Sequence, residues 1–241
     1  MAFYRYNQRT KIYPDGQTKT ITFNHPVFNP HKLPTKLKKR EYRKDKNVTR
    51  SDSLKRGIDK IYDIAMINDF DYFITFTLDK NKVDRYDYSE ICKKLKNWLN
   101  NGTKRMNLKY LIVPELHKDG AVHFHGLVSG DFTLLNSGKV TSNGQPIYNL
   151  KNWHYGFTTC IPLYGERVAV ARYICKYITK DTKRILGNLY YSGGGVRREP
   201  DSSFSYTPYW TALGNEFLVG CTGLRVKYYE SYGTDGEERE E

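Results

Sequence analysis

Two apolar runs joined by three polar residues constrain the fold of this chain more than any other stretch. The runs read KYLIVPELH, residues 109–117, and AVHFHGLVS, residues 121–129, and residues 118–120 between them read Lys-Asp-Gly. Short apolar runs on either side of a glycine-containing turn predict a β-hairpin. An antiparallel pair of strands is therefore expected at the centre of the fold.

The turn decides which side chains of this hairpin share a face. A three-residue loop, with Gly120 in the left-handed position of a bulge, pairs His117 with Ala121 and Glu115 with His123. Side chains alternate with a period of two along a strand. The set on one face would then be Glu115, His117, His123 and His125. A two-residue turn would divide the set between both faces, and the position of the glycine favours the longer loop.

Imidazoles and a carboxylate within cross-strand reach can bind a divalent metal ion. A mixed set of His123, His125 and Glu115 with open positions suits a catalytic ion better than a closed structural zinc site. The alternative is that both histidines are half-buried strand residues with local hydrogen bonds. The residues by themselves leave these two interpretations open.

Periodicity and turn residues predict the other elements. We expect helices over residues 51–68, from about residue 89 to a stop at 100–102, and over 166–182, and strands over 72–78, 156–163 and 216–229. Residues 129–152 are rich in Gly, Ser and Asn and predict a long loop. The order strand, helix, hairpin, strand, helix indicates an α+β fold, in which helices pack on one face of a central antiparallel sheet.

The last predicted helix carries the sequence YICKYITK. At about 100° per residue, Tyr173, Tyr177 and Lys180 lie to one side of the apolar stripe, with Lys176 further round. The stripe is Val170, Ala171, Ile174 and Ile178. A phenol can attack a phosphate as a covalent nucleophile when lysine and a metal ion offset the charge. The alternative is that the tyrosines pack at the rim of the core and the lysines are solvated.

The positive charge of the chain predicts a polyanionic partner, of which nucleic acid is the commonest. The 39 Lys and Arg outnumber the 26 Asp and Glu, which gives a formal net charge of +13. The expected contacts with the DNA backbone are Lys36, Lys38, Lys39, Arg40, Arg43, Arg197 and Arg198. Solvated basic surface is the alternative for each of them.

Composition also predicts boundaries and location. We expect a basic N-terminal arm or irregular extension over residues 1–50, a single domain over 51–230 and an acidic flexible tail over 231–241. The 4 cysteines lack paired spacing, so neither a zinc ribbon nor a disulfide framework is indicated. With no apolar run typical of a signal peptide or membrane span, the sequence predicts a cytoplasmic protein without a membrane partner.

Three short motifs resemble those of the HUH endonucleases. HFHGLV resembles their His-hydrophobe-His signature, YICKYITK resembles their Tyr-x-x-Lys motif in tandem, and FITFTL at residues 73–78 is similar to their first motif. The order of the motifs is that of replication initiators from rolling-circle plasmids and single-stranded DNA phages. The tandem tyrosines are similar to those of initiators from small isometric phages. The resemblance extends over about residues 55–195.

The resemblance implies a ferredoxin-like or RRM-like core with a metal site on its central strand. His123 and His125 would bind Mg²⁺ or Mn²⁺. Glu115 would be the third ligand, and His117 is an alternative or additional ligand. The ion would polarise the scissile phosphate.

The resemblance also implies a role for the tyrosine helix. Tyr173 would attack the phosphate, forming a 5′-phosphotyrosine link and releasing a 3′-OH that primes synthesis. Lys176 or Lys180 would position the phosphate or offset its charge, and Tyr177 would carry out a second transfer. Tyr177 is the rival candidate for the first attack.

The implied partner is single-stranded DNA at a replication origin, in the cytoplasm of a bacterial host. The chain contains no G-x-x-x-x-G-K-[ST] motif, so a separate helicase is expected together with a DNA polymerase. A mobilisation relaxase or a tyrosine transposase would use the same chemistry on another substrate. A noncatalytic nucleic-acid-binding module is the alternative from a different class, and a structural zinc protein is the least favoured.

Overall fold

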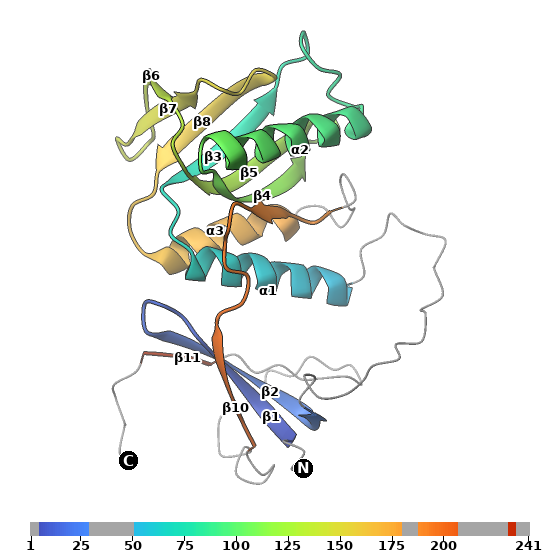
Figure 1. Cartoon of the computed structure of the whole chain (residues 1–241), viewed down its shortest axis with the longest axis vertical. Coiled ribbons are helices and arrows are strands. Elements are labelled where there is room, and N and C mark those ends of the chain that lie inside the picture. Colours follow the sequence, from blue (N-terminus) through green and yellow to red (C-terminus); the bar gives the residue numbers. More distant parts are fainter. Residues whose placement is uncertain (1–4, 29–50, 180–187, 207–230, 235–241) are drawn as a thin grey trace. The chain divides into compact units, whose positions relative to one another are not determined.

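The computed structural model describes residues 5–28, 51–179, 188–206 and 231–234 of the chain. It divides into two compact units, one of Arg43–Glu199 and one of Met1–Tyr42 with Pro200–Glu241 (Figure 1). In the described part of the chain, no helix combines the length and the apolar character needed to cross a bilayer.

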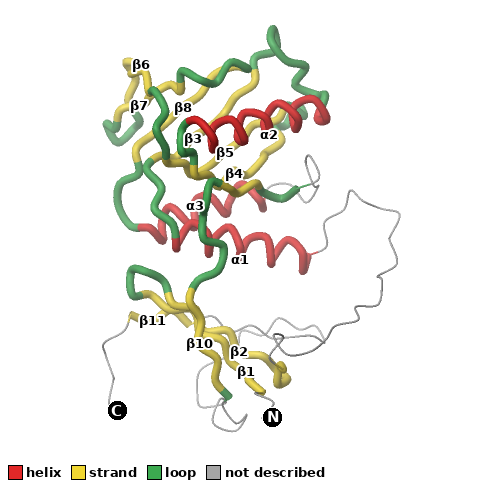
Figure 2. Tube along the Cα trace, viewed as in Figure 1, coloured by secondary structure: helices red, strands yellow, loops and turns green. Residues whose placement is uncertain are grey.

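The larger unit is built on a seven-stranded antiparallel sheet with the strand order β6-β7-β8-β3-β5-β4-β9. Figure 2 shows these strands together with three helices. The elements in chain order are α1 Ser51–Ile67, β3 Tyr72–Leu78, α2 Tyr88–Arg105, β4 Lys109–Leu116, β5 Val122–Ser129, β6 Leu134–Val140, β7 Pro146–Leu150, β8 Gly156–Pro162, α3 Arg167–Thr179 and β9 Tyr191–Gly193. This is the predicted α+β class.

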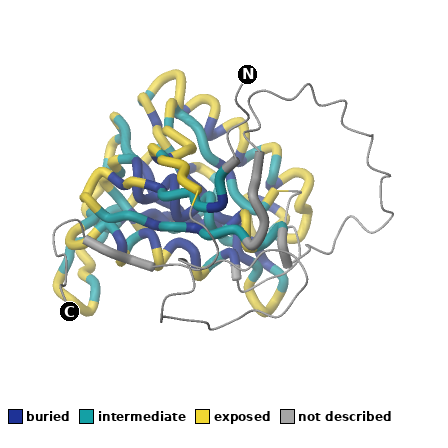
Figure 3. Tube along the Cα trace, turned by 90° about the horizontal axis from the view of Figure 1, so that it is seen from below, coloured by how far each residue is buried: buried dark blue, intermediate teal, exposed yellow. Residues whose placement is uncertain are grey.

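The helices cover both faces of the sheet, whereas the sequence analysis places them on one. On one face α2 packs Leu95 and Trp98 against Ile74 and Phe76 of β3. On the other face α1 and α3 pack against each other and contact β4 and β5. The buried segments of the chain follow these contacts (Figure 3). The alternation of β3 supplies apolar side chains to both layers, so its periodicity does not show how many faces are covered.

The helix α2 ends later than its sequence predicts. Asp87 caps its start by accepting a hydrogen bond from the Glu90 backbone N–H at 3.0 Å. The expected stop at Gly102 is wrong because that glycine is buried inside the helix, where a Cβ atom would lie 2.7 Å from Leu108 Cδ2. Asn107, with a φ of 48°, is the left-handed residue that follows the helix.

The long loop predicted over residues 129–152 contains a second hairpin, formed by β6 and β7. Its register shifts between Asn136 and Lys139, and Gly144 has a φ of 77° in the turn. Most β6 side chains are exposed. A strand that buries so little lacks the apolar alternation by which a sequence reveals a strand.

The smaller unit contains a four-stranded sheet with the order β10-β1-β2-β11. Its strands are β1 Arg5–Ile12, β2 Gln17–Phe28, β10 Asp201–Ser205 and β11 Ser231–Thr234. Two regular strands therefore occur where the sequence analysis expects an irregular extension. The predicted acidic tail begins with β11, and its remainder, together with the strand predicted over residues 216–229, lies outside the described residues.

Candidate active site

The β4–β5 hairpin has the three-residue loop that the glycine position predicts. The backbone N–H groups of His117 and Gly120 donate to the carbonyls of Ala121 and His117, each at 2.9 Å. Gly120 has a φ of +85°. Glu115 pairs with His123, so these side chains share a face of the sheet with that of His125.

Threonines of β3 lie beside these histidines on the same face. Thr75 pairs with His125, and Thr77 pairs with His123. The hydroxyl of Thr75 lies 3.1 Å from His125 Nδ1, and that of Thr77 lies 3.5 Å from His123 Nδ1. Each imidazole therefore has its Nδ1 atom next to a hydroxyl that can accept a hydrogen bond, which would leave Nε2 with its lone pair.

Glu115 and His125 form a buried polar pair. Glu115 Oε2 lies 2.6 Å from His125 Nε2, and the two residues are only 7% and 8% exposed. A short contact between two buried polar groups satisfies both of them away from water. The pair fixes a carboxylate and an imidazole within the width of one strand pair.

His123 lies next to the exposed His117. Their rings stack with centroids 3.7 Å apart. Burial lowers the pKa of His123, and the neighbouring His117 lowers it further. His123 is therefore neutral near pH 7, which is the state in which an imidazole can bind a metal ion.

Both tyrosines of α3 lie over the histidine face of the sheet. The Tyr177 ring stacks on the His125 ring with centroids 3.8 Å apart and an interplanar angle of 15°. Its hydroxyl donates a hydrogen bond to the Tyr173 hydroxyl at 2.7 Å. Phe73 supports the tyrosine pair, with its ring centroid 5.1 Å from that of Tyr173. The predicted helix and hairpin thus meet at one place.

The two phenols differ in their surroundings. Tyr173 is 45% exposed, whereas Tyr177 is half-buried. Burial raises the pKa of Tyr177, and its hydrogen bond to Tyr173 and the nearby Glu115 raise it further. Tyr177 therefore keeps its proton as a donor, and the Tyr173 oxygen accepts.

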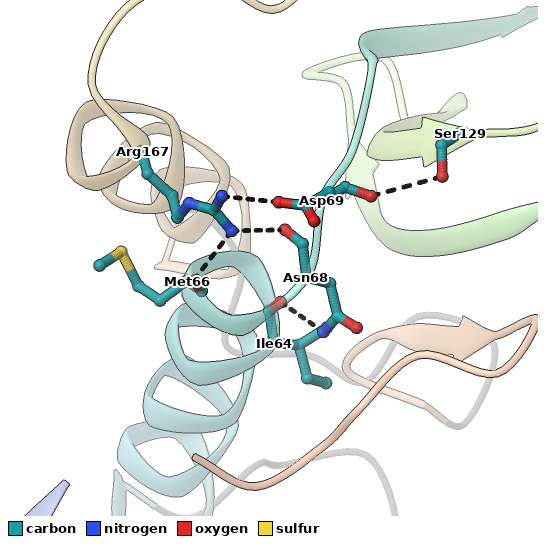
Figure 4. Close-up of polar contacts among 6 residues, drawn as sticks. All are labelled: Ile64, Met66, Asn68, Asp69, Ser129 and Arg167. Atoms are coloured by element: carbon teal, nitrogen blue, oxygen red, sulfur yellow. Dashed lines mark hydrogen bonds and ion pairs between the residues drawn. The ribbon is translucent and has the colours of Figure 1, made fainter. Parts of the chain in front are cut away.

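Arg167, the first residue of α3, ties that helix to the end of α1 (Figure 4). Its Nη1 atom donates to the carbonyls of Met66 at 3.2 Å and Asn68 at 3.1 Å, and its Nη2 atom contacts the Asp69 carboxylate at 2.6 Å. The Asp69 carbonyl in turn accepts from Ser129 Oγ in β5 at 3.4 Å. This network links the tyrosine helix to the strand that carries the histidines.

The predicted basic residues are not gathered at this site. Lys176 Nζ lies 5.9 Å from the centre of the Tyr173 ring, at a distance typical of a cation–π contact. The backbone of Arg197 bonds to the Asn68 side chain, and Arg198 donates to the Ser192 carbonyl at 3.1 Å. Outside the described residues lie Lys180, Lys36, Lys38, Lys39, Arg40 and Arg43.

Residue-by-residue reasoning from the sequence missed Thr75, Thr77 and Phe73 as parts of the site. The signal was present, because the alternation in FITFTL places these three side chains on one face of β3. What the alternation does not tell is that this face turns toward the histidines. The pairing of β3 with β5 supplies that information.

The donors at the site suit a divalent ion, although they are not arranged around one. Within the described residues, no three His, Cys, Asp or Glu side chains are grouped so as to hold a metal ion. Glu115 Oε2 and His125 Nε2 contact each other, and His123 lies one residue pair along the same face. A carboxylate and neutral imidazoles with threonine partners at Nδ1 nevertheless form a chemically suitable donor set.

One comparison with known proteins gives a match. No curated protein and no solved structure matches the chain significantly. The matching segment runs from the residue before β3 to beyond the end of α3, so it contains the histidine hairpin and both tyrosines. Residues 71–182 match the ORF2-type family of replication-associated proteins, and this similarity supports a replication-associated protein of Rep type.

Proposed function

We propose that this protein initiates rolling-circle replication by nicking single-stranded DNA at an origin and joining the cut strand to a tyrosine. The observation that carries the proposal is the stacking of Tyr177 on His125, which brings two tyrosine hydroxyls to a carboxylate and histidine cluster. The similarity of residues 71–182 to a replication-associated family supports it independently.

His123, His125 and Glu115 would hold the divalent ion, Mg²⁺ or Mn²⁺, with His117 as a further ligand. When bound, such an ion polarises a phosphoryl oxygen and offsets the charge that develops in the transition state. Thr75 and Thr77 orient the two imidazoles through their Nδ1 atoms. The low pKa of His123 keeps its ring unprotonated, so proton competition at neutral pH is weak.

Tyr173 is the first nucleophile. It is the more exposed phenol, and its oxygen accepts the hydrogen bond from Tyr177, which stabilises negative charge on that oxygen. In the transfer, a bond forms between Tyr173 Oη and phosphorus, the bond from phosphorus to the 3′ oxygen breaks, and the phenol proton goes to that oxygen. Lys176 and Lys180 offset the charge of the phosphate.

Tyr177 performs the second transfer, when the displaced strand is released and closed. Its hydroxyl lies within hydrogen-bond distance of the first nucleophile, so the same phosphate position serves both. The products are a phosphotyrosine-linked 5′ end and a free 3′-OH that a host polymerase extends in the bacterial cytoplasm. A separate helicase unwinds the duplex.

The test is incubation of the purified protein with single-stranded oligonucleotides from its replicon and Mn²⁺, followed by a denaturing gel and mass spectrometry. We expect a chelator-sensitive DNA adduct on Tyr173, absent in Tyr173→Phe and in the His123→Ala, His125→Ala double variant. Tyr164→Phe is the matched control, because Tyr164 is exposed and lies before α3. Tight metal-independent binding without any adduct would instead favour a noncatalytic binding module.

A further inference from the structure

A phenylalanine stands exposed on the histidine face of the sheet. Phe157 belongs to β8, an interior strand paired with both β3 and β7, and it is 66% exposed. Its neighbours Thr158 and Cys160 point to the opposite face, where they are buried. Because α1 and α3 contact β4 and β5, this side of β8 is left open. A large apolar side chain exposed in the middle of a sheet calls for an explanation.

The sheet register places Phe157 beside the candidate active site. Phe157 pairs with Thr77, and Thr77 pairs with His123 on its other side. Strands lie about 4.8 Å apart, so the backbones at Phe157 and His123 are separated by about 10 Å. A nucleotide chain with one phosphate at the histidines can therefore place a nearby base over Phe157.

We propose that Phe157 is a stacking platform for a base of single-stranded DNA next to the scissile phosphate. This inference rests on the proposed function and deepens it by naming a binding subsite. Every base has a π-face, so stacking on an aromatic ring holds single strands with little dependence on sequence. An extended duplex does not offer such a face, which makes the platform selective for unpaired DNA.

The surroundings of Phe157 suit DNA better than a protein partner. The same face presents hydroxyl groups at Thr75, Thr77 and Thr159 rather than a continuous apolar patch. Further along, exposed Lys139 of β6 pairs with Ile147. Ile147 lies on the Phe157 side of β7, because its neighbour Tyr148 pairs with the opposite-facing Cys160. Hydroxyl and ammonium groups around one ring match a phosphate backbone and a base.

The test measures fluorescence anisotropy of two probes in the presence of a chelator: a labelled oligothymidylate and an abasic sugar–phosphate chain of equal length. We expect Phe157→Ala to weaken binding of the oligothymidylate by about tenfold and to leave binding of the abasic chain unchanged. Phe157→Trp should bind at least as tightly as the native protein. Val140→Ala is the control, because Val140 is 64% exposed and lies on the α2 side of β6.

Equal binding of oligothymidylate by Phe157→Ala and the native protein would overturn the platform. So would an equal loss with both probes, which indicates a structural effect, or a change in sedimentation, which indicates an interface between copies. Failure of the proposed function is seen separately, as base-dependent binding without a tyrosine adduct. In the nicking assay we expect Phe157→Ala to raise KM about tenfold with kcat unchanged, whereas loss of kcat alone contradicts a binding role.

Discussion

The Tyr177 ring lies flat on the His125 imidazole, with their centroids 3.8 Å apart. We expect Tyr177→Ala to lower the free energy of unfolding by roughly 2 kcal/mol, because a half-buried ring and its stacking contact are lost. Tyr177→Phe keeps the ring and removes only the hydrogen bond to Tyr173, so it should cost about 1 kcal/mol or less. Urea denaturation followed by circular dichroism measures both, and equal losses would show that the stack adds nothing.

Thr75 and Thr77 provide a test of how the histidines are held. Replacing either by valine keeps the shape of the side chain and removes the hydroxyl next to Nδ1. We expect the affinity for Mn²⁺ to fall by about tenfold, as is common when the hydrogen-bond partner of a metal-binding histidine is lost. Titration followed by electron paramagnetic resonance gives the free Mn²⁺ concentration.

Thr159→Val is the matched control for these variants. Thr159 pairs with Thr75 from the strand on the side away from His125. The same substitution there should leave the affinity for Mn²⁺ unchanged. If Thr75→Val also binds Mn²⁺ like the native protein, the threonine does not position the histidine.

Arg167 should matter more for stability than its ion pair indicates. Arg167→Lys replaces a planar fork by a single ammonium, which cannot serve the carbonyls of Met66 and Asn68 and the Asp69 carboxylate together. We expect a loss of roughly 1 to 2 kcal/mol in urea unfolding. Asp69→Asn removes only an ion pair whose carboxylate side chain is 90% exposed, so its cost should stay within about 0.5 kcal/mol. The opposite ranking would contradict the carbonyl contacts.

Cys160 should be chemically silent in the folded protein. Burial raises the pKa of its thiol to about 12, and the reactive form is the thiolate. We expect iodoacetamide at pH 8.5 to spare Cys160 in the native state and to modify it in urea. Mass spectrometry of tryptic peptides reports this, with the less buried Cys92 as internal reference.

The same shift has a consequence for stability. The folded state holds the neutral thiol, so its contribution is fully present below the unfolded pKa of 9.0 and is lost as pH rises above it. Cys160→Ala should therefore show a smaller decline in stability between pH 9 and pH 11 than the native protein. An identical decline would mean that other groups account for it.

Much of the candidate site follows from local patterns in the sequence. The position of Gly120 and the alternation of strand residues predict which face Glu115 and His123 share, because the loop length fixes the register of a hairpin. Helical spacing likewise places Tyr173 and Tyr177 on neighbouring positions of one helix. These features depend on contacts between residues close in the sequence.

Contacts between distant segments are what the sequence does not supply. The stacking of Tyr177 on His125 requires α3 to cross the sheet at one place, and Arg167 fixes that place through carbonyl groups that have no sequence signature. The hairpin of β6 and β7 was missed because exposed strands need no apolar alternation. Phe157 was read as an ordinary strand residue, since its exposure depends on which strands the helices leave open.

The loop of Lys118, Asp119 and Gly120 has a consequence for how such proteins can diverge. A change of identity in this loop alters a solvent-exposed tip, whereas insertion or deletion of a single codon would reverse the facing of every later residue of β5. His123 and His125 would then enter the layer beneath α2, and Phe124 would point at the tyrosines. The length of this short loop is therefore inherited as strictly as the metal-binding side chains themselves.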